Sequence, residues 1–212
     1  MMSQQQLSVP ILPQLDGRLP SAEEAAVLKR AGPVIISSSA LAPALKHLQQ
    51  QQQERDSNQL AYIVALEESD ANEGSASDIL NNGAEAVITS NTDLLSSSLP
   101  ATRIILAVST ETATSAADIL SKSPSLAGVH VTLPADLSPS DAQAGQLLAD
   151  YAKLLDVKAT GRALLVSFPA HIPTAQDVVL LATNYAASLV APFSTLSFTK
   201  EMPTTAGKLD FG

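Results

Sequence analysis

Short runs of aliphatic and β-branched residues recur along this chain, separated by longer polar or mixed segments. Each run is nearly continuously apolar instead of alternating, which is the pattern of a strand buried on both faces of a parallel sheet. The eight runs occupy residues 7–12, 33–37, 60–66, 84–89, 103–108, 126–131, 163–167 and 187–191.

The segments between the runs carry signals for the start of a helix. Ser21 and Glu24 form a capping-box pattern, in which the serine oxygen and the glutamate carboxylate each accept a bond from a free backbone amide. Pro139 suits the first position of a helix, because its missing N–H has no partner to lose there. Serine followed three residues later by aspartate marks three further starts, at 75–78, 115–118 and 138–141.

Two of these segments show a helical period. Residues 142–155 place apolar side chains on one stripe, and residues 175–186 are similar, as expected for helices with one buried face. The stretch 46–59 is rich in glutamine and predicts a solvated helix end followed by a loop. The stripe of the first segment consists of Leu147, Leu148, Tyr151, Leu154 and Leu155.

Repeated alternation of strand and helix predicts a parallel α/β fold. We expect a (β/α)8 TIM-barrel-like domain over residues 1–194, and an open doubly wound parallel sheet is the alternative. The pattern stops after this domain, so residues 195–212 are interpreted as a tail or linker towards a downstream domain.

Composition narrows the functional classes. The 212 residues are 45% hydrophobic and carry a formal net charge of -9, which argues against binding the phosphate backbone of a nucleic acid. The chain contains 0 cysteines, so disulfides and thiolate zinc sites are excluded. No secretory leader and no apolar stretch of about 20 residues is visible. A soluble cytoplasmic protein is therefore expected.

Three histidines are candidates for acid–base chemistry. His130 lies within an apolar run, which favours a partnered core histidine over a catalytic one. His171 follows a predicted strand, at the end where barrel enzymes carry their active sites. His47 belongs to the polar helix end and is expected to be solvated.

Adjacent carboxylates occur at 23–24 and 67–68. Neighbouring residues on a helix diverge by about 100°, so Glu23 and Glu24 cannot hold one metal together and are interpreted as first-turn acids. Glu67 and Glu68 end a predicted strand, where one of them can point into a barrel mouth. No phosphate-binding, zinc-protease or serine-hydrolase motif is present. The residues alone therefore assign no catalytic, cofactor-binding or metal-ligating side chain.

Three segments resemble the βα barrels of histidine biosynthesis that ProFAR isomerase represents. Residues 9–17 (VPILPQLDG) are similar to the family's IPAIDLxDG strand, residues 78–90 (DILNNGAEAVITS) to LLxxGAxxVIIGT, and residues 103–109 (RIILAVS) to RIVVGLD. The resemblance places the family's catalytic acid at Pro13 and its partner at Ser109. Proline has no proton to exchange, and the serine hydroxyl has no suitable pKa near neutrality.

The same resemblance implies that the family's phosphate cradle is altered. Its Gly-Thr falls on Ser90 and Asn91, and a later Gly-Gly falls near Phe168 and Pro169. The proline removes a backbone amide, and the phenylalanine fills the approach that glycine leaves open. The resemblance therefore implies a barrel whose isomerase site has been lost.

A second resemblance extends loosely over most of the chain. The phrases PILP at 10–13 and ILNNG at 79–83 are similar to the N-terminal region of the fungal-type trifunctional histidine-biosynthesis proteins. That family carries phosphoribosyl-AMP cyclohydrolase, phosphoribosyl-ATP pyrophosphohydrolase (diphosphatase) and histidinol dehydrogenase. The resemblance implies that these domains would follow in cis beyond 208–212, and that zinc and NAD bind there and not in this chain.

The expected function is a non-catalytic N-terminal domain or fragment of such a multifunctional L-histidine biosynthesis enzyme, assisting the folding or assembly of the other domains. One alternative is a small barrel enzyme or sugar-phosphate-binding protein, and another is a regulatory or interaction module. Neither a nucleic acid nor a membrane is expected as a partner. The enzyme alternative would use Glu67, Ser109, His130 and His171 at the strand ends.

Overall fold

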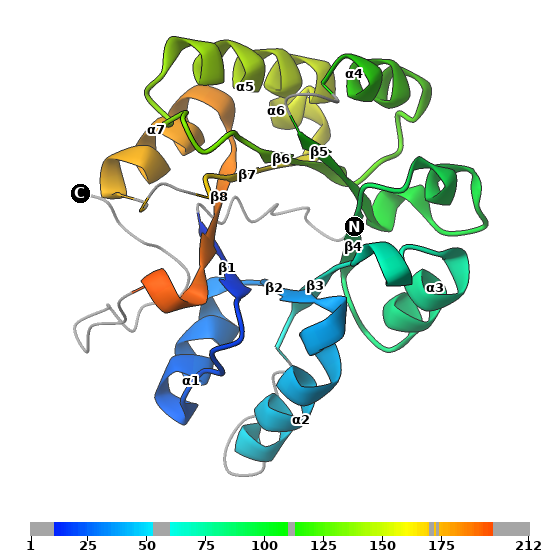
Figure 1. Ribbon diagram of the computed structural model, residues 1–212, viewed down its shortest axis with the longest axis vertical. Coiled ribbons are helices and arrows are strands. Elements are labelled where there is room, and N and C mark those ends of the chain that lie inside the picture. Colours follow the sequence, from blue (N-terminus) through cyan, green and yellow to red (C-terminus); the bar gives the residue numbers. More distant parts are fainter. Residues whose placement is uncertain (1–10, 53–59, 110–112, 170–171, 173, 197–212) are drawn as a thin grey trace.

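Eight parallel strands close into a barrel, and helices form a ring around it (Figure 1). The computed structural model describes residues 11–52, 60–109, 113–169, 172 and 174–196. Strands that follow one another along the chain are neighbours in the barrel, and the last strand pairs with the first. The strands are β1 (Ile11–Leu15), β2 (Val34–Ser37), β3 (Tyr62–Ala65), β4 (Ala86–Thr89), β5 (Ile104–Ser109), β6 (Gly128–Thr132), β7 (Ala163–Ser167) and β8 (Ser188–Pro192).

The closed strand order confirms the expected (β/α)8 TIM-barrel-like fold and excludes the open doubly wound sheet. Every apolar run after the first overlaps the strand it predicts. The first run predicts a strand over 7–12, of which 7–10 lie outside the described residues, whereas β1 continues to Leu15. The extension includes Pro13, although proline is rare inside a sheet because it has no N–H to donate to the neighbouring strand. The β1–β2 register begins only after this residue, at Gln14, so the position without an N–H precedes that ladder.

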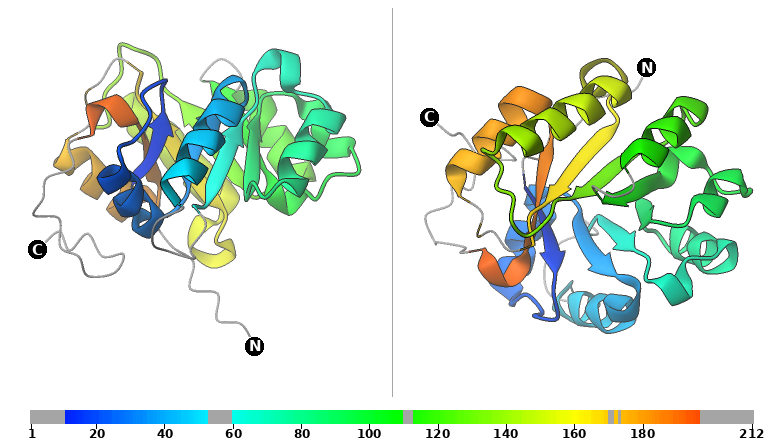
Figure 2. Two further views of the ribbon diagram at one scale, coloured as in Figure 1. Left: turned by 90° about the horizontal axis from the view of Figure 1, so that it is seen from below. Right: turned by 45° about the horizontal axis from the view of Figure 1, so that its top comes forward.

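Helices cross between the strands on the outside of the barrel (Figure 2). The connection between β4 and β5, which the structure describes in full, contains two 3-10 turns, η3 (Thr92–Ser96) and η4 (Ala101–Arg103), in place of an α-helix. A further turn, η6 (Phe193–Thr195), follows β8. None of the described helices combines the length and the apolar character needed to cross a bilayer. The α-helices are α1 (Ala22–Ala31), α2 (Leu41–Gln52), α3 (Glu73–Asn81), α4 (Ala113–Lys122), α5 (Ala142–Leu155), α6 (Val157–Thr160) and α7 (Ala175–Tyr185).

The helix starts follow the capping signals in part. Ser21 and Glu24 form the predicted capping box at α1. α3 and α4 both start before the serine that was predicted to cap them. At α3 the Asn72 side chain takes that role, because it accepts a bond from the backbone N–H of Ser75 at 3.0 Å. Pro139 lies in the turn before α5 and not in its first position.

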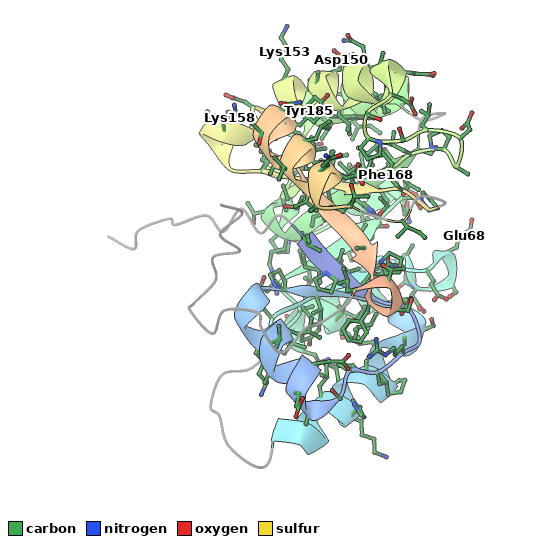
Figure 3. All side chains as sticks on the ribbon, turned by 90° about the vertical axis from the view of Figure 1, so that its left-hand side faces the viewer. Glu68, Asp150, Lys153, Lys158, Phe168 and Tyr185 are labelled. Atoms are coloured by element: carbon green, nitrogen blue, oxygen red, sulfur yellow. The ribbon has the colours of Figure 1, made fainter. Side chains whose placement is uncertain are left out.

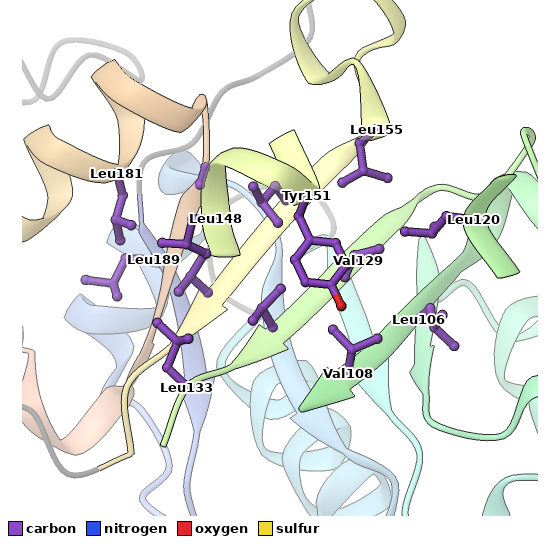
Figure 4. Packing of buried hydrophobic residues seen from close by; sticks show 14 of the residues in the cluster. Leu106, Val108, Leu120, Val129, Leu133, Leu148, Tyr151, Leu155, Leu181 and Leu189 are labelled. Atoms are coloured by element: carbon purple, nitrogen blue, oxygen red, sulfur yellow. The ribbon is translucent and has the colours of Figure 1, made fainter. Parts of the chain in front are cut away.

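Alternate residues of the strands divide the core into two shells, because neighbours along a strand point to opposite sides. The outer shell lies between the strands and the helices, where Tyr151 of α5 packs beside Val129 and Val108 (Figure 4). The inner shell fills the barrel with aliphatic side chains from every strand except β6. It consists of Leu12, Ile35, Ile63, Ala86, Ile88, Ile105, Leu165 and Val190.

α5 shows how the outer shell forms. The predicted apolar stripe is confirmed at Leu148, Tyr151 and Leu155, which are buried against the strands. Leu154 is 38% exposed, so its place in the predicted stripe is wrong. The buried row continues instead through Ala144, because residues three or four apart share one face of a helix.

Candidate functional site at the barrel mouth

The carboxyl ends of the eight strands meet at one face, the end at which barrel enzymes carry their sites. The side chains that point inward at this end follow by alternation from the inner shell: Gln14 comes two residues after Leu12, and Ser167 two after Leu165. We call this inward-facing set the barrel mouth. It consists of Gln14, Ser37, Ala65, Ala107, Ser109, His130, Thr132, Ser167 and Pro192.

Three hydroxyl side chains of the barrel mouth form a row across adjacent strands. The register pairs Ser109 of β5 with Thr132 of β6, and Thr132 with Ser167 of β7. Residues in register on neighbouring parallel strands point to the same side of the sheet. The row arises because each of these strands ends on a serine or threonine after its aliphatic residues.

His130 lies deeper in the barrel than this row. On β6 it is flanked by Val129 and Val131, which both belong to the outer shell, so the imidazole points inward. Its Nε2 lies 2.6 Å from the hydroxyl oxygen of Ser167, and the tautomer decides which of the two atoms donates. Burial lowers the pKa of His130 to about 4, because the imidazolium loses its hydration inside the barrel. The ring is therefore neutral at pH 7.

Solvent reaches past the rim of the barrel mouth as far as His130. Ala65, Ala107 and His130 are partly exposed although they point into the barrel. Other inner-shell side chains are sealed, since Ile35 is only 1% exposed and Ile88 only 3%. Ala65, Ala107 and His130 are therefore less enclosed than the aliphatic side chains deeper in the barrel.

The candidates named from the sequence are dispersed. Ser109 and His130 both lie in the barrel mouth, on neighbouring strands. Glu67 follows β3 and is exposed at the rim, where its carboxylate accepts a hydrogen bond from the Ser39 hydroxyl. His171 lies outside the described residues. The interpretation of His130 as a partnered core histidine is confirmed by its contact with Ser167.

Pro13 faces away from the barrel interior. Leu12 before it belongs to the inner shell, whereas Leu15, two residues after Pro13, packs in the outer shell. A general acid on β1 has to face the mouth to reach a substrate there, and the residue that does so is Gln14. Neither a glutamine amide nor the Ser109 hydroxyl can act as a general acid or base near neutral pH.

His47 corrects one prediction. It was expected to be solvated, but its Nε2 lies 2.8 Å from the backbone carbonyl oxygen of Pro20. The contact forms because α2 packs beside α1, whose preceding loop contains Pro20. His47 therefore holds the loop after β1 and lies outside the barrel mouth.

The carboxylates in the loop after β3 accept hydrogen bonds from serines in the loop after β2. The Ser38 hydroxyl donates to the Asp70 carboxylate at 2.6 Å and accepts from the backbone N–H of Glu67 at 3.1 Å. The neighbouring Ser39 hydroxyl donates to Glu67. These bonds connect the loops after β2 and β3, so their first role is to fix two neighbouring loops.

The positions that the family resemblance assigns to phosphate binding also have structural partners. The Asn91 side-chain amide donates to the Ala71 carbonyl at 2.7 Å, and its oxygen accepts from the backbone N–H of Asp93 at 3.0 Å. Phe168 is only 5% exposed and packs in the outer shell. Both therefore stabilise the loops in which the resemblance expects a cradle.

The rim of the mouth is acidic. Within the described part of the loops that follow the strands, the basic side chains are Arg18, which pairs with Glu24, and Arg103, which donates to backbone carbonyls that precede β4. Figure 3 shows Glu68 at the edge toward which the strand arrowheads point and Lys158 at the opposite edge. The acidic side chains of these loops are Asp16, Glu67, Glu68, Asp70, Asp93, Asp136 and Asp141.

Sequence reasoning missed the polar mouth residues Gln14, Ser37, Thr132 and Ser167, which the structure adds to Ser109 and His130. The available signal was their place at strand ends, but which of them point inward depends on the register between strands. Among the residues described, no group of three or more His, Asp or Glu side chains lies close enough together to hold a metal ion.

A scan of the chain against protein-family models gives no match, and a search of curated proteins gives none either. The functional argument therefore depends on the barrel fold and on the geometry of its mouth.

Proposed function

We propose that this chain is a non-catalytic barrel domain of a multifunctional L-histidine biosynthesis enzyme. The observation that supports it is the loss of both proton-exchanging positions of the isomerase-like barrel. Pro13 has no titratable group and points away from the mouth, and Ser109 replaces the partner carboxylate. The barrel is intact around these positions, as in a domain that keeps its fold after its chemistry is lost.

The imidazole in the mouth does not replace that chemistry. A general base works best when its pKa lies near the working pH, whereas burial holds the pKa of His130 at about 4. Its contact is a serine hydroxyl, at 2.6 Å. A neutral, weakly basic ring next to a hydroxyl can accept or donate a hydrogen bond but is poorly suited to removing a proton from carbon.

In this proposal the domain acts as a folding or assembly module. Its partners are the phosphoribosyl-AMP cyclohydrolase, phosphoribosyl-ATP diphosphatase and histidinol dehydrogenase domains to which the resembling segments are joined in that family. Zinc and NAD then belong to those domains. The acidic rim supports this role, since it disfavours the anionic phosphoribosyl substrates of the pathway.

The test is a set of isomerase, cyclohydrolase, diphosphatase and dehydrogenase assays on the purified chain. We expect no turnover above the blank in any of them. Turnover that disappears in the double variant His130→Gln, Ser167→Ala would contradict the proposal and locate activity in the barrel mouth. Turnover that survives this variant would contradict it as well and indicate a site elsewhere in the chain.

One observation favours a second candidate, a barrel that binds a sugar phosphate through a non-standard site. The inward-facing Ser109, Thr132 and Ser167 offer hydroxyls at the end of the barrel where such ligands bind. A thermal-shift titration with ribose 5-phosphate tests it, because a ligand at 100 times its Kd stabilises by about 2.7 kcal/mol. No shift at millimolar concentration would reject this candidate.

A further inference from the structure

The turn that joins α3 to β4 contains the dipeptide Asn82–Gly83, and both residues are exposed to solvent. An asparagine followed by glycine is especially prone to spontaneous deamidation, because glycine has no side chain to hinder attack by its backbone nitrogen. Every other asparagine of the chain is followed by a residue with a side chain. We propose that Asn82 is a deamidation site and that the Tyr62 hydroxyl sets its rate in the folded protein.

The reaction needs no reagent other than water. The Gly83 backbone nitrogen attacks the side-chain carbonyl carbon Cγ of Asn82, so that a nitrogen–carbon bond forms and a cyclic imide results. The Nδ2 amide nitrogen leaves as ammonia and takes the proton that the Gly83 nitrogen gives up. Water then opens the imide at one of its two carbonyls. The product has an aspartyl or an isoaspartyl residue in place of Asn82.

The conformation of Asn82 keeps the reacting atoms apart. Ring closure requires Cβ and the Gly83 nitrogen to eclipse about the Cα–C bond, which tetrahedral geometry places at a ψ of about -120°. This value lies outside the main allowed regions of the backbone. Asn82 has a φ of -85° and a ψ of 10°, so the Gly83 nitrogen is rotated away from the side chain. The reaction therefore requires a rotation of the peptide group between the two residues.

Hydrogen bonds at the end of α3 oppose this rotation. The Asn82 backbone N–H donates to the Asp78 carbonyl at 3.0 Å, and Nδ2, the leaving group, donates to the same oxygen at 2.8 Å. The Gly83 N–H, which carries the attacking nitrogen, donates to the Leu80 carbonyl at 3.3 Å. These bonds all lie within the last turn of the helix, so they can open together when the helix end frays.

Tyr62 restrains the same peptide group from another element. Its hydroxyl donates to the Asn82 carbonyl oxygen at 2.9 Å, and its ring is only 3% exposed on β3. Rotation about ψ of Asn82 turns this carbonyl away, so the bond has to break before the imide can form. The barrel therefore controls the reaction through one hydrogen bond.

Deamidation weakens the turn in which it occurs. A carboxylate in place of the Asn82 amide cannot donate to the Asp78 carbonyl as Nδ2 does. The new negative charge also lies at the C-terminus of α3, where the helix dipole disfavours it. The isoaspartyl product adds one carbon to the backbone path. Chains that have aged or opened at this turn are therefore marked by a permanent change.

The experiment incubates the full chain at mildly alkaline pH and measures the modified fraction at each asparagine by peptide mass spectrometry. The same chain unfolded in guanidinium chloride gives the rate without structural restraint. We expect Asn82 to react faster than any other asparagine of the unfolded chain. In the folded chain its rate should be at least about tenfold lower, because the turn has to open first.

Two tyrosine variants form a matched pair. Tyr62→Phe removes the bond to Asn82 and keeps the ring, whereas the buried Tyr151 hydroxyl has no partner within the described part of the chain. We expect Tyr62→Phe to raise the rate at Asn82 in the folded chain about fivefold, which corresponds to the loss of one neutral hydrogen bond. Tyr151→Phe should leave the rate unchanged.

A further variant separates local opening from global unfolding. Thr174 caps α7, where its hydroxyl oxygen accepts the Asp177 backbone N–H at 3.3 Å. Loss of a cap destabilises a protein about as much as loss of one hydrogen bond, but Thr174→Ala should leave the rate at Asn82 unchanged. If Tyr62→Phe does not fold, guanidinium chloride below the unfolding transition supplies the same distinction, because local opening leaves the wild-type rate nearly constant.

Three results would overturn the proposal. The first is that Asn82 in the unfolded chain reacts no faster than the other asparagines, and the second is that the folded chain reacts as fast as the unfolded one. The third is a rate that follows global stability, seen as equal acceleration by Tyr62→Phe and Thr174→Ala or as a steep rise in dilute guanidinium chloride. The deamidation site does not depend on the role proposed for the domain in histidine biosynthesis.

Discussion

Gly128 lies where the barrel leaves no room for a Cβ atom. A Cβ at this position would lie 2.1 Å from the carbonyl oxygen and 2.9 Å from the carbonyl carbon of Ala163, its partner on β7. Both are backbone atoms and cannot rotate away. We expect Gly128→Ala to destabilise the fold by about 3 kcal/mol or more, because overpacking forces the two strands apart. Urea unfolding measures this as a lower midpoint.

The chain supplies a matched control for this substitution. Gly74 lies in the first turn of α3, where an added Cβ would come no closer than 3.5 Å to the Asn72 side chain. Gly74→Ala should stabilise the protein by about 0.5–1 kcal/mol, because alanine loses less backbone entropy in a helix. Equal effects at Gly74 and Gly128 would show that the close approach of β6 to β7 is absent.

The buried hydroxyl of Tyr151 lowers the stability of the fold. Among the described residues it has no hydrogen-bond partner, and its ring packs between α5 and the strands (Figure 4). An unsatisfied buried hydroxyl costs about 1–3 kcal/mol, so we expect Tyr151→Phe to be neutral or to stabilise by about 1 kcal/mol. Burial also raises the pKa of this phenol.

Tyr62 is the control for that prediction. Its hydroxyl donates to the Asn82 carbonyl at 2.9 Å, so Tyr62→Phe should destabilise the protein by about 1 kcal/mol. Thermal unfolding of both variants in parallel measures the contrast. If Tyr151→Phe were the more destabilising of the two, the Tyr151 hydroxyl would have to make a bond in solution.

The sequence predicted individual residues where their role is local. Ser21 and Glu24 form the predicted capping box because both partners lie within one helical turn. The contact between His130 and Ser167 joins residues 37 positions apart, and the pattern along the chain contains no signal for it. The same limit explains why Gln14 was missed, since its inward direction depends on pairing with other strands.

At the scale of elements, Arg103 fixes the connection from α3 to β4. Its Nε donates to the Glu85 carbonyl at 3.0 Å, and its Nη2 donates to the Leu80 carbonyl at 3.2 Å and to that of Ala84. Leu80 lies in the last turn of α3, where its carbonyl also accepts the Gly83 backbone N–H at 3.3 Å, and a cation at this end interacts favourably with the helix dipole. One side chain thus secures the end of α3 and the start of the next strand.

We expect Arg103→Met to destabilise the protein by about 2–3 kcal/mol, because the methionine keeps the apolar stem but leaves the carbonyls without their donor. Hydrogen exchange should show the loss of protection concentrated in the last turn of α3. Arg18→Met removes an exposed pair with Glu24 and should cost no more than about 1 kcal/mol. Comparable losses in the two variants would refute the role given to Arg103.

Elements were predicted best where the apolar pattern is strong. The strands from β2 to β8 and the bounds of α5 agree with the sequence pattern. A strand buried on both faces needs a continuous apolar run, and a helix buried on one face needs an apolar stripe, so both can be recognised from the residue types. The errors lie where local signals compete with packing. β1 extends past Pro13, and Asn72 caps α3 ahead of the predicted serine.

At the scale of the molecule, closure of the barrel could not be predicted from the sequence pattern of any single strand or helix. The repeat of strand and helix is compatible with an open or a closed sheet, and the pairing of β8 with β1 decides between them. The acidic rim also has a whole-molecule cause. All helices of such a barrel start at the same end, so acids that favour helix N-termini gather there, as Glu24, Glu73 and Asp177 do.

The response of the whole fold to acid should depend on His130. Its pKa is about 4 in the folded barrel because of burial, against about 6.5 in an unfolded chain. As the pH falls, the imidazole of the unfolded chain is therefore protonated before that of the folded barrel, which favours unfolding. The contribution of the neutral His130 to the free energy of unfolding is complete above pH 6.5 and is lost as the pH falls towards 4. Over that window we expect a loss of about 2–3 kcal/mol in the free energy of unfolding.

The difference between wild type and His130→Gln isolates this effect. A hydrogen bond from the Ser21 backbone N–H lowers the pKa of Glu24, so protonation of this carboxylate also destabilises the fold in acid. This effect is equal in both proteins. Urea unfolding at a series of pH values should therefore give a difference that changes between pH 6.5 and 4 and is constant above that window. A difference that stays flat across the window would mean that the imidazole is hydrated in the folded protein and that burial does not lower its pKa.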